Sequence, residues 1–377
     1  MNILFITPWS PDDRTCGGGV RSGLMLRALS ELGNVVTVVG GAPRGIRFQI
    51  KWFLMLPFMC FPKLMDRFYF TKKQILKQFG LDGKEFDITV VRYVRTMNAN
   101  AAWKIAPCFL DVDDLPSQAF NTLSIHTHCL FKRKVVVGLL RIWESLLIRR
   151  STGFWVCNYS QIPLLEKHGN CEYLPNVADP PVDGFRYEHV GQFQFLTVGG
   201  MSYSANREGV DWFVENVWPR IVFLHPDAIY NIVGGGTPEH LLKKWGNIQG
   251  VRLWGFVDNL SKRYEEADIV IAPIFAGAGT CIKVREAALH GRKTLATPFG
   301  ARGLNDENRR ALGVDVCSTA DEFVAAVERF QALSNEDRKQ LQVSIAREAR
   351  LRVSYERFAE SVRSLVCKVL MRTCDGR

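Results

Sequence analysis

The sequence predicts an α/β protein built from two doubly wound, Rossmann-like domains. Apolar segments typical of buried strands alternate with helix-like segments along most of the chain, which is the pattern of parallel sheets. With 377 residues, the chain is too long for one ordinary core. Glycine-rich turns follow several predicted strands, at the edge where open α/β sheets bind ligands. We therefore expect two domains that face a ligand cleft.

The first domain is predicted over residues 1–177. A helix is expected from about Val20 to about Gly33, and the apolar segment Arg133–Arg150, with its basic ends, predicts a long second helix. The predicted strands are 2–7, 34–41, 86–93, 107–114, 153–158 and 171–176. The stretch 177–191 contains prolines and a glycine without periodicity, so we expect it to link the domains.

The second domain is predicted over residues 192–345, and it repeats the alternation of strand and helix. The predicted strands are 193–201, 228–236, 251–257, 268–274 and 293–298, and the predicted helices are 207–221, 238–245 and 258–267. Charged helical material follows from Asn335 onward. Its last part, residues 346–377, is assigned to a separate helical segment that could cross back to the first domain.

Composition indicates a soluble protein of a reducing compartment. Hydrophobic residues make up 47% and charged residues 23% of the chain, as in ordinary globular proteins. The ten cysteines form no C-x-x-C pair, so neither a zinc site nor a disulfide framework is indicated. The opening "MNILFITPW" lacks the basic start of a signal peptide and is expected to form a strand. A cytoplasmic protein is the expectation.

The net charge of +10 is concentrated in the first part of the chain. Residues 1–150 contain 21 Lys and Arg against 11 Asp and Glu, which predicts an anionic partner for the first domain. No zinc finger, helix-turn-helix or arginine-rich signature favours nucleic acid, so an anionic membrane surface is the better candidate. The basic clusters Lys132–Lys134 and Arg149–Arg150 fit such docking, or they form a solvated face.

The longest apolar run, Trp52–Phe61, is too short to span a bilayer and is interrupted by Pro57. Two interpretations stay open for this run: an interior helix, or an anchor that lies in the plane of the membrane interface.

The triplet His126–His128 has metal-like spacing, but no third ligand cluster accompanies it. Structural or solvated histidines are therefore the favoured interpretation.

The stretch "GAGTCIKVREAALHG" (Gly277–Gly291) carries the most specific functional signal. Its first residues have almost no side chain, and it follows a predicted buried strand and precedes a helical turn. Strand, bare loop and helix together direct free N–H groups at an anion. Lys283 and Glu286 share one helix face, with His290 one turn further along. The pattern fits a phosphate at the loop with a carboxylate for hydroxyls; a surface salt bridge is the alternative.

A dinucleotide site is the obvious competitor for these phosphate contacts. "CGGGVRSGL" (Cys16–Leu24) spaces its glycines one residue too far apart for the usual fingerprint. The second predicted strand also ends without the acid that would hold a ribose hydroxyl. The sequence therefore disfavours NAD(P).

The second half resembles the donor domain of family 4 glycosyltransferases, retaining enzymes with the GT-B fold. The matching segments are "LPNVAD", "VGGMSYSANREGVDWFVENVWP", "NIVGGG", "LWGFVDNL" and "ADIVIAPIFAGAGTCIKVREAALHGRKTLATPFGARGL", in the family's order. In the first half the likeness is limited to "NILFITPW", the glycine loop and "FLDVDDL". The resemblance implies a nucleotide-diphosphate sugar as donor substrate, bound mainly by the second domain, with no metal or other cofactor.

Individual positions match the family's donor-binding residues. They are Gly18 and Gly19 for the first-domain loop that approaches the phosphates or sugar, Phe256 and Val257 for the base, Gly279, Thr280 and Lys283 for the diphosphate, and Glu286 for the ribose.

The sequence departs from the family pattern at three places. Ala278 stands where many members carry a glutamate that touches the sugar, and Lys293 stands where a proline is usual. The family's Arg–Lys pair after the first strand of the donor domain is not evident, Arg207 being the nearest cation. These departures put donor identity and activity itself in question.

The motif "DVDD" (Asp111–Asp114) has three interpretations. A D-x-D motif holds a metal in the other large glycosyltransferase fold, but here it lies in the wrong domain for that role. In many family members a histidine near this strand end faces the sugar, and Asp113 takes its place by position. Asp113 is therefore the candidate acceptor base or sugar contact. A helix cap or turn is the alternative.

These observations predict a glycosyltransferase that acts with retention on a glycan or lipid-linked acceptor of surface polysaccharide biosynthesis, at the inner face of the membrane. Sugar transfer passes through a transition state with oxocarbenium character, and its diphosphate leaving group needs cations such as Lys283. Two alternatives stay open: a nucleotide-sugar epimerase of the same fold, or a non-catalytic nucleotide-sugar-binding protein.

Overall fold

The computed structural model describes residues 1–13, 16–40, 70–123, 130–177, 191–277 and 279–375. The predicted run Trp52–Phe61, the triplet His126–His128 and Ala278 lie outside the described residues. The chain divides into two compact units, and each contains one parallel sheet of six strands. The first unit comprises residues 1–175 and 356–377, and the second comprises 176–355. The predicted α/β fold with two Rossmann-like sheets is confirmed.

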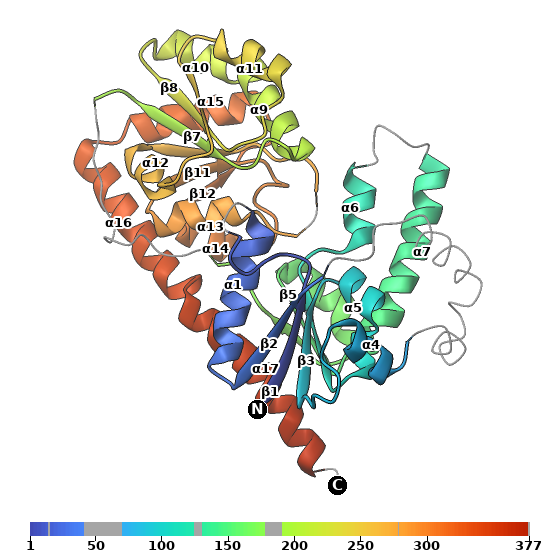
Figure 1. Ribbon diagram of the computed structural model, residues 1–377. Helices are drawn as coiled ribbons and strands as arrows, with labels where there is room; N and C mark the ends of the chain where they lie inside the picture. Colours follow the sequence, from blue (N-terminus) through green and yellow to red (C-terminus); the bar gives the residue numbers. More distant parts are fainter. Residues whose placement is uncertain (14–15, 41–69, 124–129, 178–190, 278, 376–377) are drawn as a thin grey trace. The chain divides into compact units, whose positions relative to one another are not determined.

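The sheet of the first unit has the strand order β2-β1-β3-β4-β5-β6 (Figure 1). Its strands are β1 (Asn2–Thr7), β2 (Asn34–Val39), β3 (Ile88–Arg92), β4 (Cys108–Val112), β5 (Gly153–Val156) and β6 (Cys171–Tyr173). Its helices are α1 (Gly17–Ser30), α4 (Lys72–Gln78), α5 (Val94–Asn100), α6 (Pro116–Leu123), α7 (Leu130–Ile148), α8 (Ile162–Leu165) and α17 (Tyr355–Asp375), with short 3-10 turns at 102–104, 159–161 and 166–168.

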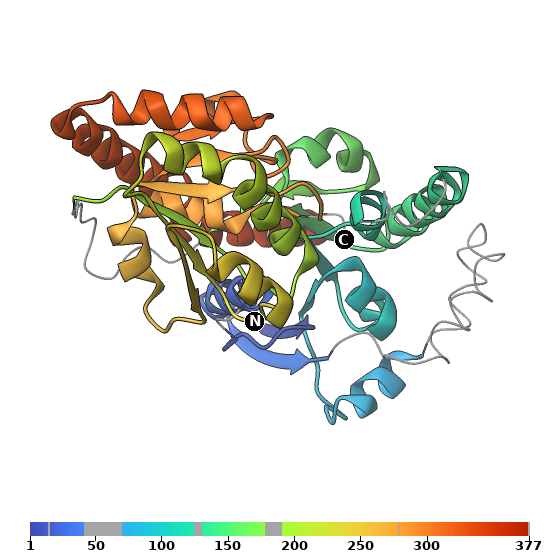
Figure 2. The ribbon, with the colours of Figure 1, turned by 90° about the horizontal axis from the view of Figure 1, so that it is seen from above.

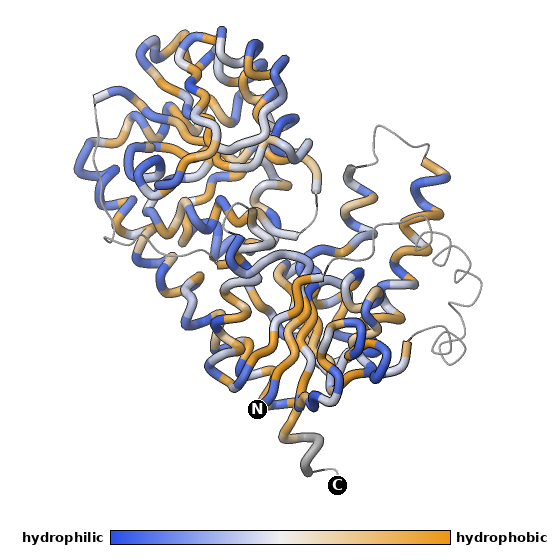
Figure 3. Tube along the Cα trace, in the orientation of Figure 1, coloured by the Kyte–Doolittle hydropathy of each residue, from blue (hydrophilic) through white to orange (hydrophobic). Residues whose placement is uncertain are grey.

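Both faces of this sheet are covered, so its central strands β1, β3 and β4 are largely apolar. Leu4 and Ile6 point into a core that also contains residues of α4, α5 and α7. The alternate face is covered by α1 and α17 (Figures 1 and 2). On that face the Trp155 indole donates to the carbonyl of Ser361 in α17, at 3.2 Å. The strands accordingly form the most hydrophobic part of the unit in Figure 3.

The sheet of the second unit has the strand order β12-β11-β10-β7-β8-β9. Its strands are β7 (Gln194–Val198), β8 (Ile229–Val233), β9 (Val251–Gly255), β10 (Ile269–Ala272), β11 (Lys293–Ala296) and β12 (Val314–Val316). Its helices are α9 (Ser204–Asn216), α10 (Trp218–Leu224), α11 (Glu239–Gly246), α12 (Leu260–Glu266), α13 (Ile282–Leu289), α14 (Asp306–Ala311), α15 (Ala320–Gln331) and α16 (Asn335–Arg352).

The second unit also buries both faces of its sheet. Phe195, Tyr230 and Ile271 belong to the core cluster that contains residues of α9, α10, α11 and α15, whereas Leu196 and Val270 meet residues of α12 and α13. The segment 207–221 was expected to be one helix and is instead divided between α9 and α10 at Val217. Pro219 explains the division, because proline is accommodated in the first turn of a helix and not in its interior.

Candidate functional site

The stretch Gly277–Gly291 folds as the bare loop and helix that its sequence predicts. Strand β10 is fully buried, and α13 begins after the loop. Gly277 and Gly279 have φ of 125° and 64°, values that favour glycine. A Cβ on Gly277 would lie 2.6 Å from the Tyr203 hydroxyl oxygen, so a larger residue there would displace the Tyr203 side chain. Gly291 ends the helical region with φ of 69°, as expected for a left-handed cap.

Lys283 lies on the first turn of α13 and reaches the loop that follows β7. Its Nζ donates to Oδ1 of Asn206 at 2.8 Å, and a Cβ on Gly199 would lie 3.0 Å from that nitrogen. Burial lowers the pKa of Lys283, and the nearby Arg302 acts in the same direction. Within the described part of the chain, Lys283 forms no salt bridge. A half-buried cation whose hydrogen-bond partner is a neutral amide is a natural anion site.

Glu286 lies one turn further along α13 and accepts a hydrogen bond from the Tyr264 hydroxyl at 2.8 Å. Burial and the charge of Glu286 raise the pKa of Tyr264 well above its ordinary value, so the phenol remains a donor. His290 stacks on the same ring with centroids 4.7 Å apart, and burial lowers its pKa to about 4. The carboxylate of Glu286 is therefore held on a rigid, neutral aromatic support.

Thr280 is buried in the loop before α13, where Asn176 fixes its hydroxyl. Nδ2 of Asn176 donates to Oγ1 of Thr280 at 2.9 Å, and both side chains are buried. A threonine hydroxyl that accepts one hydrogen bond still has its own proton to donate. In the described residues no acceptor for that proton is present. The pair thus presents an O–H donor beside the loop amides.

Arg302 is a second cation at this loop, and sequence reasoning did not assign it. Its Nε donates to the carbonyl of Gly279 at 2.6 Å, and its Nη1 donates to that of Phe299 at 2.9 Å. The guanidinium also lies over the Phe299 ring, 4.0 Å from the centroid. The signal that could have identified it is an arginine between two glycines in "FGARGL" (299–304), a few residues after strand β11 ends.

Phe256 and Val257 follow β9, at the same carboxyl edge of the sheet as the loop. Val257 packs against the core, whereas 62% of Phe256 is exposed. A Cβ on Gly235 would contact the Cβ of Phe256 at 3.7 Å, and a Cβ on Gly234 would lie 1.9 Å from the Gly199 carbonyl oxygen. The glycine turns after β7 and β8 therefore lie between Phe256 and Lys283. The turn after β8 lies beside Phe256 and against Gly199, and Gly199 lies beside Nζ of Lys283. The second unit brings together the predicted residues of its own half.

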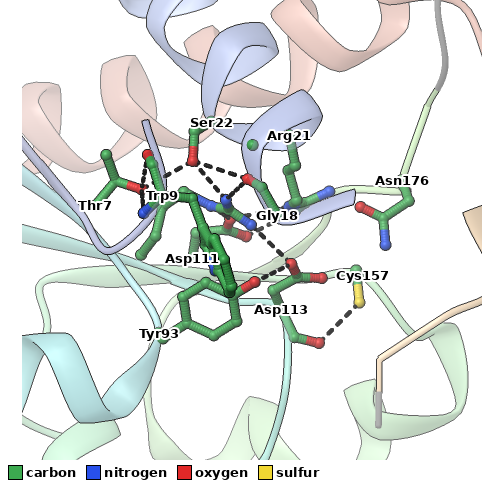
Figure 4. Close-up of polar contacts among 12 residues, drawn as sticks. Thr7, Trp9, Gly18, Arg21, Ser22, Tyr93, Asp111, Asp113, Cys157 and Asn176 are labelled. Atoms are coloured by element: carbon green, nitrogen blue, oxygen red, sulfur yellow. Dashed lines mark hydrogen bonds and ion pairs between the residues drawn. The ribbon is translucent and has the colours of Figure 1, made fainter. Parts of the chain in front are cut away.

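The first unit places Gly18 and Asp113 at a buried ionic cluster (Figure 4), and Gly19 follows Gly18 in the first turn of α1. Arg92 donates from Nη2 to Asp113 at 2.7 Å, from Nε to Asp111 at 2.9 Å, and from Nη1 to the Gly18 carbonyl at 2.5 Å. The expected glycine loop is in fact the first turn of α1, because this helix begins at Gly17, and one guanidinium ties that turn to the end of β4. A Cβ on Gly19 would lie 1.9 Å from the Asp13 carbonyl oxygen, so this first turn of α1 also depends on its glycines.

Asp111 is the centre of the cluster and is itself fully buried. It also accepts two hydrogen bonds from Arg21, at 2.7 and 2.9 Å, which is a bidentate pair. The two arginines hold the pKa of Asp111 below its ordinary value despite burial. Both Asp111 oxygens are thus engaged by guanidinium groups. Among the described residues no group of three or more His, Cys, Asp or Glu is placed to hold a metal.

Tyr93 occupies a strained backbone position, and its hydroxyl donates a hydrogen bond to Oδ2 of Asp113 at 3.0 Å. Its φ of 68° is rare for a non-glycine residue, and such strain is often found at functional sites. Burial and Asp113 raise the pKa of Tyr93 well above its ordinary value, so the phenol stays protonated. Asp113 is consequently oriented by two donors, Arg92 and Tyr93. Sequence reasoning missed both.

The residues at the departures from the family pattern are engaged elsewhere. Nη1 of Arg207 donates to the carbonyls of Met201 and Ser202, each at 2.7 Å, and so stabilises the turn before α9. Lys293 pairs with Asp315 at 2.6 Å on the neighbouring strand.

Within the described ranges, no helix is both long and apolar enough to cross a membrane.

Comparison with known proteins places this geometry in context. Residues 192–332 match the sequence model of Glycosyl transferases group 1. Sucrose-phosphate synthase from Thermosynechococcus elongatus has a similar structure, with TM-score 0.70, 14% identity, and coverage of 98% of this chain and 99% of that one. No curated protein matches the chain.

Two further structures have the same architecture. Anabaena HepE in complex with UDP-glucose gives a TM-score of 0.63 at 13% identity, covering 98% of this chain and all of that one (100%). A glycosyltransferase from Rickettsia africae gives 0.59 at 11% identity, covering 98% of each chain. The chain therefore has the GT-B fold, and its residues 192–332 are similar to Glycosyl transferases group 1.

Proposed function

We propose that this protein transfers a sugar, with retention of configuration, from a nucleotide-diphosphate sugar to a glycan or lipid-linked acceptor in surface polysaccharide biosynthesis. The observation that carries the proposal is Lys283. It is a half-buried cation beside a glycine loop, without a salt bridge in the described part of the chain, and one helical turn from a held carboxylate. A pyrophosphate would supply the counter-ion that this lysine lacks.

The second unit would bind the donor through four kinds of contact. Lys283 and Arg302 would neutralise the diphosphate, and the Thr280 hydroxyl with the loop amides would donate hydrogen bonds to it. Glu286 would accept hydrogen bonds from the ribose hydroxyls, and Phe256 and Val257 would meet the base. The UDP-glucose complex of HepE supports a donor of this class, because that protein has the same fold.

In the reaction, the bond between the anomeric carbon and the diphosphate oxygen breaks while negative charge grows on the leaving group. Lys283 and Arg302 are preorganised to stabilise that charge without moving. We further propose that Gly18 and Gly19 approach the phosphates or sugar, and that Asp113 contacts the acceptor or the sugar. Arg92 and Tyr93 both donate hydrogen bonds to Asp113 and so fix its carboxylate, which supports this proposed role.

The direct test is a thermal-shift panel of UDP- and GDP-sugars, with uridine and guanosine as controls that lack the diphosphate. A ligand at 100 times its dissociation constant should stabilise the protein by about 2.7 kcal/mol. NMR of the product would then read the anomeric configuration. Absence of stabilisation by every nucleotide sugar would contradict the proposal. Donor turnover without an acceptor would indicate an epimerase, and Lys283→Ala and Glu286→Ala variants that still support glycan assembly in cells would indicate a non-catalytic role.

A further inference from the structure

Helix α7 presents an apolar stripe to solvent. Phe131, Val135, Leu139 and Ile142, here called the α7 stripe, are all exposed, with 78% of Phe131 and 51% of Ile142 accessible. Their spacing of three and four residues places them on one side of the helix. The opposite side carries Leu140, Trp143 and Leu147 and packs into the core of the first unit. The α7 stripe is therefore an exposed apolar surface, separate from the side of α7 that packs into the core.

Basic residues flank the α7 stripe. By helical position, Lys134 and Arg141 lie along one side of it and Lys132 along the other, and all three are exposed. The single acid of α7 is Glu144, which is buried and accepts hydrogen bonds from the backbone N and the hydroxyl of Ser117. The exposed side of α7 is therefore apolar along its centre and positive at its edges. Figure 3 shows the two kinds of residue following one another along the helix.

Helix α7 also extends beyond the sheet of its unit. It lies beside α6, and the two helices project together in both views (Figures 1 and 2).

We propose that the α7 stripe docks on an anionic lipid bilayer, with the helix in the plane of the interface. Apolar residues between basic flanks are the pattern of helices that lie in an anionic membrane surface. Residues 132–150 include six basic residues, so this helix is not expected to cross the bilayer. A second copy of this chain fits less well, because a self-complementary contact would bring Lys134 and Arg141 against the same residues of the partner.

This inference rests on the proposed function and extends it. A bilayer held at α7 would present a lipid-linked acceptor to the first unit, so the partner of the enzyme would be the membrane that carries its acceptor.

The test is sedimentation of the full chain with vesicles of phosphatidylglycerol and phosphatidylcholine, compared with vesicles of phosphatidylcholine alone. We expect binding to the anionic vesicles that weakens with salt. Replacing Lys132, Lys134 and Arg141 together by Gln should lower the partition coefficient by about 100-fold, since each basic residue near such a surface contributes roughly fivefold. Phe131→Ser with Ile142→Ser should also abolish most binding, because it removes buried apolar contact.

Matched controls lie in the second unit. The first control, Phe223→Ser, changes a phenylalanine of α10 that is 83% exposed. The second replaces Lys339, Arg347 and Arg350 of α16 together by Gln and so removes three exposed charges. Both controls should bind anionic vesicles as the wild type does. Equal loss in the controls, no binding by the wild type, or a stripe variant that changes the oligomeric state instead of vesicle binding would overturn the proposal. Nucleotide-sugar binding by the same variants, followed by thermal shift, reports separately on the proposed function.

Discussion

Asn176 holds the hydroxyl of Thr280 by a hydrogen bond of 2.9 Å, although the two residues are more than a hundred positions apart in the chain. The bond fixes Oγ1 as an acceptor for Asn176, so the hydroxyl proton can be donated to a ligand. If that ligand is a diphosphate, Asn176 is a positioning residue that acts through Thr280.

We expect Thr280→Val to weaken binding of UDP or GDP, whichever the panel selects, by roughly 10- to 100-fold, the range for a hydrogen bond to a charged group. Asn176→Ala should weaken it less. A double-mutant cycle by titration calorimetry separates the effects, because Asn176→Ala should add little in the Thr280→Val background. Thr280→Ser, which keeps the hydroxyl, should restore most of the affinity. Additive losses in the cycle would argue against coupling between the two residues.

Lys283→Met should separate binding from stability. Loss of the cation should reduce nucleotide affinity by at least about tenfold, because the diphosphate loses a charge-assisted contact. The free energy of unfolding without ligand should stay equal or rise, since Lys283 has no salt bridge in the described residues and burial already lowers its pKa. Urea unfolding and nucleotide titration measure the two effects. Lys262→Met, at an exposed position on α12, is the control and should change neither. A destabilised variant that still binds nucleotide would contradict this assignment.

Tyr93→Phe tests the support of Asp113. The variant keeps the ring that Arg92 covers at 4.9 Å and removes only the hydroxyl. We expect kcat to fall by roughly tenfold, the effect of about 1.4 kcal/mol at the transition state, with donor affinity unchanged. Steady-state kinetics with nucleotide titration would show the split. Tyr159→Phe, on an exposed ring of the same unit, should leave both quantities as they are. A fall in donor affinity with normal kcat would assign Tyr93 to the donor side instead.

His290 predicts a pH dependence of stability. Burial lowers its pKa to about 4 in the folded chain, whereas the unfolded value is near 6.5. The unfolded state therefore binds the proton more readily, so this contribution is complete above pH 6.5 and is lost as pH falls toward 4. At pH 5 the loss should be about 2 kcal/mol relative to neutral pH.

The measurement is urea unfolding at pH 7.5 and pH 5 for the wild type and for His290→Phe. The phenyl ring keeps the stack on Tyr264 but does not titrate, so the difference between the two pH values should shrink by that amount. Other acids titrate in both proteins and cancel in the comparison. An unchanged difference would show that His290 is not the group responsible.

The residues predicted from sequence were those whose signal is local. Strands such as β1 and β10 are continuous apolar runs, and the loop before α13 is marked by consecutive small residues. Arg302 and Asn206 reach the same loop from segments that follow other strands, so no short window contains the relationship. The role of Arg92 was not evident from the sequence for another reason: it ends an apolar strand, and its partners Gly18 and Asp113 come from the first turn of α1 and the end of β4.

Helix α17 gives the first unit an unusual order of synthesis. The unit is interrupted after Pro175 by the whole second unit and is completed by residues 356–377. Phe358, Val362 and Val366 of α17 are fully buried, and the carbonyl of Ser361 in this helix accepts the hydrogen bond of Trp155. During synthesis the second unit has its entire sequence available while the first unit still lacks α17, which covers part of one face of its sheet. The half of the protein whose synthesis begins first is therefore the half whose sequence is completed last.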